Sequence, residues 1–416
     1  MPNNAVLAPV RRPERGLWRL LGPAFVAAVA YVDPGNVAAN LTAGAQYGYL
    51  LLWVLVAANA MAVLIQYLSA KLGLVTGRTL PQLIGERLGR PARLTFWGQA
   101  EIVAAATDIA EVIGGALALN LLFGLPLVLG GVIVGTVSLA LLVVQSRRGQ
   151  RSFEFVIIGL LAIIAIGFTA GLLVAPVNWA DAAAGLVPHF AGPQTVLLAA
   201  SMLGATVMPH AIYLHSALAR DRHIPDGVPD DSRTTRLIRA TRHDVGWAML
   251  AAGAVNIAML LLAASSLRGV PGTESIEGAH SALESQLGQG FATVFAIGLL
   301  ASGLAATSVG AHAGAVIMDG LLLKRIPLTV RRVVTLIPAL FILAAGADPT
   351  WALVLSQVVL SLGIPFALVP LVRLTSNAEL LGRHVNRRLT SVVAWIVAAL
   401  IVSLNVALIV ITVRGT

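Results

Sequence analysis

A charged motif interrupts a long apolar stretch near the start of the chain. Residues 32–36 read Val-Asp-Pro-Gly-Asn, with apolar segments on both sides. Pro34 removes a backbone hydrogen bond, Gly35 frees the backbone, and a charge at the depth of a bilayer is costly. Asp33 supplies a carboxylate and Asn36 an amide oxygen, which are hard ligands for a cation. We therefore expect an unwound helix whose oxygens face a polar cavity, rather than a surface loop.

A second interruption occupies residues 204–210, which read Gly-Ala-Thr-Val-Met-Pro-His between two apolar segments. Pro209 breaks the helix, and unwinding releases backbone carbonyls such as that of Ala205. Met208 adds a soft thioether, which has little affinity for Mg²⁺ or Ca²⁺ but tolerates Mn²⁺, Fe²⁺, Co²⁺ and Cd²⁺. The two interruptions together favour a site for a divalent transition metal. A plain proline kink beside a core methionine is the alternative for this second motif.

Three carboxylates lie along one apolar stretch. Glu101, Asp108 and Glu111 are spaced by seven and three residues, which places them along one face of a helix. Such a group is costly in a membrane unless it lines a water-filled path or pairs with cations, for which Arg331 and Arg332 are candidates. We expect a proton route here, although Glu101 alone is also consistent with a solvated position near the cytoplasmic interface.

Titratable groups at the two interruptions extend this route. Asp33 can exchange a proton for metal, because coordination requires the ionised carboxylate. His210 can relay or tune that proton, or simply satisfy a freed carbonyl. His215 lies about 140° around the helix from His210, so the two are not expected to bind one ion. We assign gating to His215 and to the backbone-breaking residues Pro34, Gly35 and Pro209.

The composition requires a bilayer. Hydrophobic residues make up 57% of the 416 residues and charged ones 11%, and the mean hydropathy is +0.86. A soluble core could not hide this much apolar surface. Cysteine is absent, which excludes disulfides and thiolate ligands. Residues 1–19 are basic and lack an apolar core and a small-residue cleavage site, so we expect a cytoplasmic tail and no signal peptide.

The apolar stretches predict an all-α membrane protein with eleven transmembrane helices. The predicted spans are 20–45, 49–72, 93–122, 126–145, 153–174, 194–218, 243–267, 289–322, 331–347, 350–373 and 390–412. The largest hydrophilic stretch, 219–242, is expected to be a loop that contains six arginines.

Basic residues fall on one side of these spans. With a cytoplasmic N-terminus, only Arg268 and Arg414 of the 28 basic residues lie on the outer side. The net charge of +9 therefore reflects topology and not nucleic-acid binding. We expect a multi-pass protein of the inner (plasma) membrane, with its N-terminus cytoplasmic and its C-terminus extracytoplasmic.

The two interruptions each lie in the first helix of a block of five spans. Residues 20–174 and 194–373 would form two repeats of opposite orientation, and 390–412 would be an additional span. Broken helices 1 and 6 in such a 5+5 inverted repeat are typical of transporters that bind substrate at the membrane midplane between the breaks.

These motifs closely resemble those of the natural resistance-associated macrophage protein (Nramp) metal transporters. The resemblance rests on residues 33–36, on 208–210 and 214–216, and on Thr-Asp-Ile-Ala-Glu at 107–111, and extends over essentially the whole chain. It implies a leucine-transporter-like fold, symport of metal with protons, and a network between the third and ninth spans. It also implies the metal ligands Asp33, Asn36, Met208 and the carbonyl of Ala205, with Gln357 and the carbonyl of Ala30 joining in some conformations.

On this basis we predict a proton-coupled importer of Mn²⁺ or Fe²⁺, and of Co²⁺ or Cd²⁺, that works by alternating access. Metal and protons are substrates, the lipid bilayer surrounds the protein, and no cofactor, nucleic acid or obligate protein partner is expected. A sodium-coupled amino-acid symporter of the same architecture, a cation channel and a membrane-embedded hydrolase are the alternatives. No zinc-protease, nucleophile-elbow or P-loop motif is present, so the protein is not expected to be an enzyme.

Overall fold

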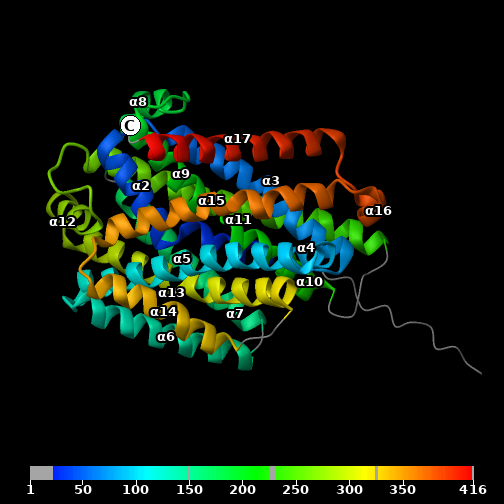
Figure 1. The fold of residues 1–416 in the computed structure, drawn as a ribbon. Helices are drawn as coiled ribbons and strands as arrows, with labels where there is room; N and C mark the ends of the chain where they lie inside the picture. Colours follow the sequence, from blue (N-terminus) through cyan, green and yellow to red (C-terminus); the bar gives the residue numbers. More distant parts are fainter. Residues whose placement is uncertain (1–21, 149, 174, 225–230, 324–326, 415–416) are drawn as a thin grey trace, which may run out of the picture.

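Long helices packed side by side form the molecule. The computed structural model describes residues 22–148, 150–173, 175–224, 231–323 and 327–414, and within these it contains helices and no strand. The predicted tail at 1–19 lies outside them. In Figure 1 the short helices α8 and α12 lie at one end of the bundle with the C-terminus, and α4 and α16 lie at the other end.

The helices overlap the predicted spans, although several begin or end at other residues. Those of the first half are α1 (Pro23–Val29), α2 (Pro34–Tyr47), α3 (Leu52–Thr76), α4 (Leu80–Arg87), α5 (Arg90–Phe123), α6 (Leu127–Arg148), α7 (Gln150–Thr169) and α8 (Trp179–Ala184). Those of the second half are α9 (Pro193–Thr206), α10 (Pro209–His223), α11 (Asp231–Ser266), α12 (Ile276–Leu287), α13 (Gln289–Ile317), α14 (Leu328–Ala344), α15 (Pro349–Thr375), α16 (Ala378–Leu381) and α17 (Arg388–Arg414).

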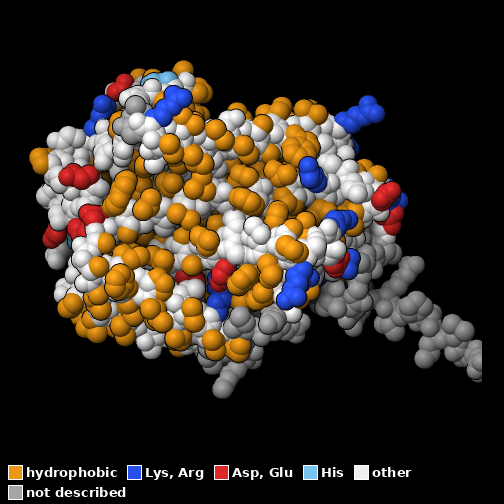
Figure 2. Space-filling model, in the orientation of Figure 1, with side chains coloured by type: hydrophobic (Ala, Val, Ile, Leu, Met, Phe, Trp, Pro, Cys, Tyr) orange, Lys and Arg blue, Asp and Glu red, His pale blue; other side chains and the backbone are white. Residues whose placement is uncertain are grey.

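The described residues contain seven helices, counting α9 with α10 as one, that are long and apolar enough to cross a membrane, together with three shorter apolar ones. The chain is thus a multi-pass membrane protein, while the count of eleven spans stays a prediction. Figure 2 agrees with this reading, because an apolar band covers the side of the bundle and charged side chains gather towards its ends. One smaller group of acidic and basic atoms interrupts the band over α5 and α14.

The stretch 219–242 is not the loop that its polarity suggested. Helix α10 continues to His223 and α11 already begins at Asp231, with the segment 225–230 outside the described residues. Arginine is a good helix former, so a basic composition alone does not end a helix. Asp231 pairs with Arg383 and His384 beyond α16, which ties the start of α11 to the end of the bundle that carries α4.

The two breaks are shorter than predicted. In the first, a 3₁₀ turn at Ala30–Val32 is followed by Asp33 in an extended conformation, and helix α2 starts again at Pro34. In the second, only Val207 and Met208 leave helical geometry. Each break lies directly before a proline, because proline disfavours helical geometry in the residue that precedes it, here Asp33 and Met208. Pro34 and Pro209 themselves occupy the first turn of the next helix, where a missing N–H costs nothing.

Side chains from neighbouring helices hold the carbonyls that the first break exposes. The amide of Asn256 on α11 donates to the carbonyl of Tyr31 at 2.7 Å. The hydroxyl of Ser302 on α13 donates to the carbonyl of Val32 at 2.5 Å. A buried carbonyl without a partner is expensive, so these two bonds fix the break between α11 and α13.

Helix α15 contains two internal prolines, and each frees the carbonyl four residues earlier. The carbonyl freed by Pro365 belongs to Ser361, and it accepts from the amide of Asn405 on α17 at 2.8 Å. The carbonyl freed by Pro370 belongs to Phe366, and the hydroxyl of Tyr213 on α10 lies 3.4 Å from it. Helices α10 and α17 thus donate hydrogen bonds to the two carbonyls of α15 that its prolines leave without an intrahelical partner.

Candidate functional site

A buried polar cluster joins the two breaks. The amide of Asn36 donates to Asp33 Oδ1 at 2.9 Å and to the carbonyl of Ala205 at 2.9 Å. The backbone N–H of Asn36 also donates to Asp33 Oδ1, at 2.8 Å, so Asp33 caps helix α2. Gln357 Nε2 on α15 lies 3.3 Å from Asp33 Oδ2. Asp33, Asn36 and Gln357 have no solvent exposure, so four predicted ligand residues meet inside the bundle.

This cluster offers oxygens that the protein itself does not use. Asn36 Oδ1 and Gln357 Oε1 are buried and accept no hydrogen bond, which is unusual for buried polar atoms. Among the described residues, no group of three His, Cys, Asp or Glu side chains is placed to hold a metal. A cation at the breaks would therefore bind one carboxylate, Asp33, together with neutral amide and carbonyl oxygens, and this donor set suits a hard or borderline divalent ion.

Two glycines allow Gln357 to approach the cluster. A Cβ atom on Gly35 would lie 1.8 Å from Gln357 Nε2, and one on Gly204 would lie 2.0 Å from the carbonyl oxygen of Gln357. Gly35 is helical and not in the left-handed region. The prediction that it loosens the backbone is therefore wrong, since Gly35 provides space instead. Gly204 was part of the predicted break, but the sequence did not predict that it makes room for the backbone of α15 at Gln357.

The remaining predicted ligands also lie at the breaks. Met208 is fully buried between α9 and α10, directly before Pro209. Ala30 begins the 3₁₀ turn three residues before Asp33. The structure places both residues at the breaks, and their part as metal ligands stays a prediction.

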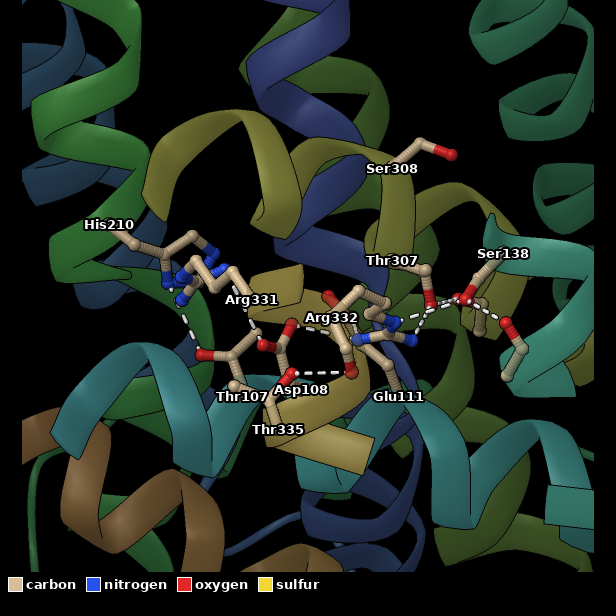
Figure 3. Close-up of polar contacts among 12 residues, drawn as sticks. Thr107, Asp108, Glu111, Ser138, His210, Thr307, Ser308, Arg331, Arg332 and Thr335 are labelled. Carbon is tan, nitrogen blue, oxygen red and sulfur yellow. Dashed lines mark hydrogen bonds and ion pairs between the residues drawn. The ribbon is translucent and has the colours of Figure 1, made fainter. Parts of the chain in front are cut away.

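A second buried network lies between α5, α13 and α14. Arg332 Nη1 lies 2.9 Å from Asp108 Oδ1 and 3.5 Å from Glu111 Oε2. The same guanidinium donates to Ser138 at 3.0 Å and to Thr307 at 3.2 Å. Figure 3 shows Arg332 between the two carboxylates and these two hydroxyls. Arg332 is only 1% exposed, so its charge is balanced almost entirely by these partners.

Arg331 extends the network to the third carboxylate. Its Nε donates to Glu101 Oε1 at 3.0 Å, and its Nη1 lies 3.6 Å from Asp108 Oδ2. The pairing of Arg331 and Arg332 with the acidic face of α5 thus agrees with the expectation from the sequence. Glu101 keeps 25% of its side chain exposed, which also fits the alternative that this residue is solvated near the cytoplasmic interface. The proton role of these residues stays a prediction.

Helix α5 passes both breaks and connects them to this network. Thr107 Oγ1 lies 3.3 Å from His210 Nδ1, which belongs to the second break. A Cβ atom on Gly114 would lie 2.1 Å from the side chain of Pro34 in the first break. Asp108 and Glu111 occupy the helical turns between these two contacts. The part of α5 that carries Asp108 and Glu111 therefore lies next to both breaks.

His215 belongs to a different contact. Its Nδ1 lies 2.7 Å from Gln66 Oε1 on α3, and the amide of Gln66 contacts the hydroxyl of Tyr31 at the first break. The two histidines of α10 thus face different partners, as their helical separation predicted. The contact links α10 to α3 and to the 3₁₀ turn, and the gating role of His215 stays a prediction.

Several neutral residues of these networks were not predicted. They are Gln66, Thr107, Ser138, Asn256, Ser302 and Thr307. Thr107 adjoins a predicted carboxylate, and the others carry no local signal. A single uncharged hydroxyl or amide in an apolar helix is compatible with many structures, and only its neighbours on other helices give it a role.

Known proteins resemble this chain over nearly its whole length. Residues 24–411 match the Nramp family, described as natural resistance-associated macrophage protein-like. The divalent metal cation transporter MntH of Mycobacterium tuberculosis (strain CDC 1551 / Oshkosh) is 63% identical over 399 residues, which cover 96% of this chain and 92% of that protein.

Solved structures agree with this match. The Eremococcus coleocola manganese transporter, crystallised with an aromatic bis-isothiourea substituted compound, has a TM-score of 0.85 at 32% identity and covers 97% of this chain and 89% of that one. The nucleobase-cation-symport-1 family transporter Mhp1, at 16% identity and a TM-score of 0.60 over 98% of this chain and 92% of that one, shares the fold alone. The resemblance inferred from the motifs is confirmed, and the chain belongs to the Nramp family.

Proposed function

We propose that this protein imports a divalent transition metal, Mn²⁺ or Fe²⁺ and also Co²⁺ or Cd²⁺, together with protons. The observation that carries the proposal is the buried cluster of Asp33, Asn36, Ala205 and Gln357, in which two amide oxygens have no hydrogen-bond partner. The amide nitrogens of Asn36 and Gln357 now face the Asp33 carboxylate. Rotation of both amides by 180° would turn their oxygens towards a divalent cation bound to Asp33. The names of two relatives, a divalent metal cation transporter and a manganese transporter, support the same substrate class.

In this proposal the metal sits between the two breaks. Asp33, Asn36, Met208 and the carbonyl of Ala205 bind it, and Gln357 and the carbonyl of Ala30 join in some conformations. Release of the metal requires relative motion of α1, α2, α9 and α10 against the helices that hold the breaks. Rocking of these broken helices would open the site first to one side of the membrane and then to the other.

The proposed topology has eleven spans, with repeats at 20–174 and 194–373 and a final span at 390–412. The N-terminus is cytoplasmic and the C-terminus extracytoplasmic, in the inner (plasma) membrane. The distribution of arginine supports this orientation. The C-terminus lies at the end of the bundle opposite α4 and α16, where Arg78, Arg87 and Arg383 are found. No obligate protein partner is proposed, because one chain supplies every residue of the cluster.

Protons would move through the acidic face of α5. Glu101, Asp108 and Glu111 oppose the two guanidinium groups of Arg331 and Arg332. One carboxyl group is therefore in excess, and burying an unpaired charge is expensive. A proton shared within this group would balance it and could pass towards Asp33 when metal binds.

The direct test is Mn²⁺ uptake into proteoliposomes under an inward pH gradient, with a pH-sensitive dye trapped inside. We expect uptake that saturates at micromolar Mn²⁺ and internal acidification that depends on added Mn²⁺. Protein-free liposomes and the same proteoliposomes given Mg²⁺ are the controls. Sodium-dependent leucine uptake, with no flux of Mn²⁺, would replace the proposal with the amino-acid symporter. Mn²⁺ flux that rises linearly without saturation would indicate a channel.

Met208→Ala is expected to change the choice of metal more than the rate of transport. The oxygens of the cluster remain, so Mn²⁺ uptake should persist in part. Loss of the thioether removes the bias against hard ions, and Ca²⁺ uptake should rise at least about tenfold relative to Mn²⁺. Met202→Ala is the matched control, because Met202 is equally buried on α9 but lies before the break. Unchanged selectivity in Met208→Ala would refute the thioether argument.

A further inference from the structure

An apolar cavity lies away from the metal cluster, at the end of the bundle that carries α4. It has a volume of about 420 Å³, within the usual range for small-molecule sites, and is lined by α4, the start of α5 and the last turns of α15. Nine of its eleven lining residues are apolar, and the other two are Arg87 and Arg373. No carboxylate lines it. The cavity is thus an apolar space that carries two positive charges.

The two arginines occupy equivalent places on their helices. Arg87 follows Leu83 by four residues in the last turn of α4, and Arg373 follows Val369 by four residues in the last turn of α15. Residues four apart share a helical face. On both helices an apolar lining residue precedes the arginine by one turn, and another, Leu88 or Leu374, directly follows it. Each guanidinium therefore lies beside the apolar wall of the cavity.

Within the described residues, no protein group pairs with either guanidinium. Both arginines are exposed, and in the described part of the chain neither has an ion pair or a hydrogen bond. Arg78, which lies close by in sequence, is instead paired with Glu86 at 2.5 Å. Phe96 and Phe366 form the aromatic side of the cavity, where their rings meet edge to face with centroids 5.9 Å apart. This side is open, because Phe366 is 41% exposed. The cavity is therefore accessible from the side of the bundle.

We propose that this cavity binds an anionic phospholipid, with an acyl chain against Leu83, Phe96 and Val369 and the phosphate between Arg87 and Arg373. Basic pockets between transmembrane helices on the cytoplasmic side suit such headgroups. A free phosphate would leave the apolar wall unused, and a zwitterionic lipid would leave the two positive charges partly unbalanced. The assignment to the inner leaflet rests on the proposed orientation, whereas the site itself does not depend on metal transport.

The test compares lipid binding to the purified full chain by native mass spectrometry. Phosphatidylglycerol and phosphatidylcholine with the same acyl chains are titrated separately, and inorganic phosphate is added as a competitor. We expect the wild type to bind one phosphatidylglycerol at least about tenfold more tightly than phosphatidylcholine. Millimolar inorganic phosphate should not displace it, because phosphate lacks the acyl chain.

Three variants locate the site. Arg87→Gln with Arg373→Gln should abolish the preference for phosphatidylglycerol, and Val369→Trp should weaken binding of both lipids by filling the cavity. Arg239→Gln is the matched control, because this exposed arginine of α11 lies outside the cavity. A cooperative thermal unfolding transition in detergent, at a temperature close to that of the wild type, verifies that each variant is folded. Equal binding of both lipids by the wild type, an unchanged double variant, an equal loss in Arg239→Gln, or displacement by phosphate would each overturn the proposal.

Discussion

Replacing Asp33 with asparagine is expected to abolish Mn²⁺ uptake while leaving the protein folded. Asn and Asp are equally good helix N-caps, so the bond from the Asn36 N–H that starts α2 can persist. Gln357 can rotate its amide and offer Oε1 to the new NH₂ group in place of the present 3.3 Å contact from Nε2. The substitution therefore removes one negative charge from the cluster and little else.

The expected size of this effect is large because Asp33 is the one carboxylate in the cluster. Loss of an outer partner of a metal ligand typically costs about 10–100-fold in affinity, so loss of the charged ligand itself should cost at least about a hundredfold. Mn²⁺ binding can be followed separately from transport by thermal unfolding in detergent. A hundredfold excess of Mn²⁺ over its Kd should stabilise the wild type by about 2.7 kcal/mol and the variant hardly at all.

Two further variants sharpen this prediction. Asp33→Glu keeps the charge but moves it by one methylene group in a fully buried space, so we expect weakened but measurable binding. Asp181→Asn makes the same chemical change on the exposed helix α8 and should leave both uptake and stabilisation unchanged. If Asp33→Asn still gained stability from Mn²⁺, the metal would bind elsewhere and the assignment of the cluster would be wrong.

The sequence was most informative about charged residues that stand within apolar helices. A carboxylate at position 33 and three more on α5 are conspicuous within apolar helices, because each is costly in a bilayer unless it has a function or a partner. The same reasoning selected Arg331 and Arg332 as partners, and the structure pairs both with α5. Charge and hydropathy thus point to Asp33 and to the network on α5, whereas Gln357 was expected only from the family resemblance.

The sequence was less informative about local backbone geometry. Pro34 and Pro209 mark the two breaks, but the residues that leave helical geometry are Asp33 and Met208 directly before them, and Gly35 lies within a regular turn of α2. Proline is tolerated in the first helical turn and disruptive further in, and the difference depends on where the preceding helix stops. For Gly35 the deciding factor is a side chain 322 residues later, Gln357, which no local pattern reveals.

Helix α17 has a role in the structure that its sequence did not indicate. It was predicted only as a span added to the two repeats, because its sequence is an apolar run. In the structure Asn405 accepts from the hydroxyl of Ser361 at 2.7 Å and donates to its carbonyl at 2.8 Å. It thereby replaces the bond that Pro365 cannot make, one turn from Gln357. This contact needs the kink in α15 and the packing of α17 to be known together.

Replacing Arg332 with methionine is expected to be the most destabilising change in the ion-pair network. Methionine fills much of the same space, but it leaves Asp108 with the 3.6 Å contact to Arg331 and removes the ion pair that the described residues give Glu111. Breaking a buried ion pair by removing one partner costs about 3–5 kcal/mol. Thermal unfolding in detergent should show this loss, and Arg331→Met should lose less, because its partner Glu101 is partly solvated.

The cause of this loss can be separated from a packing defect. If unpaired carboxylates are responsible, then adding Asp108→Asn and Glu111→Gln to Arg332→Met should restore most of the stability, since no buried charge is then left uncompensated. If the cause is the lost contacts of Arg332 with Ser138 and Thr307, the triple variant should remain as unstable as the single one.

The triple variant also tests the proposed proton route. It keeps Asp33, Asn36, Ala205, Met208 and Gln357, so Mn²⁺ should still bind and stabilise it. It lacks the titratable groups of α5 nearest the breaks, so Mn²⁺ uptake in proteoliposomes should proceed with little internal acidification. Acidification that matched the wild type would place the proton route elsewhere, and Asp33 and His210 would then be the remaining titratable groups at the breaks. The measured ratio of proton to metal flux therefore separates metal binding from proton transfer within the same protein.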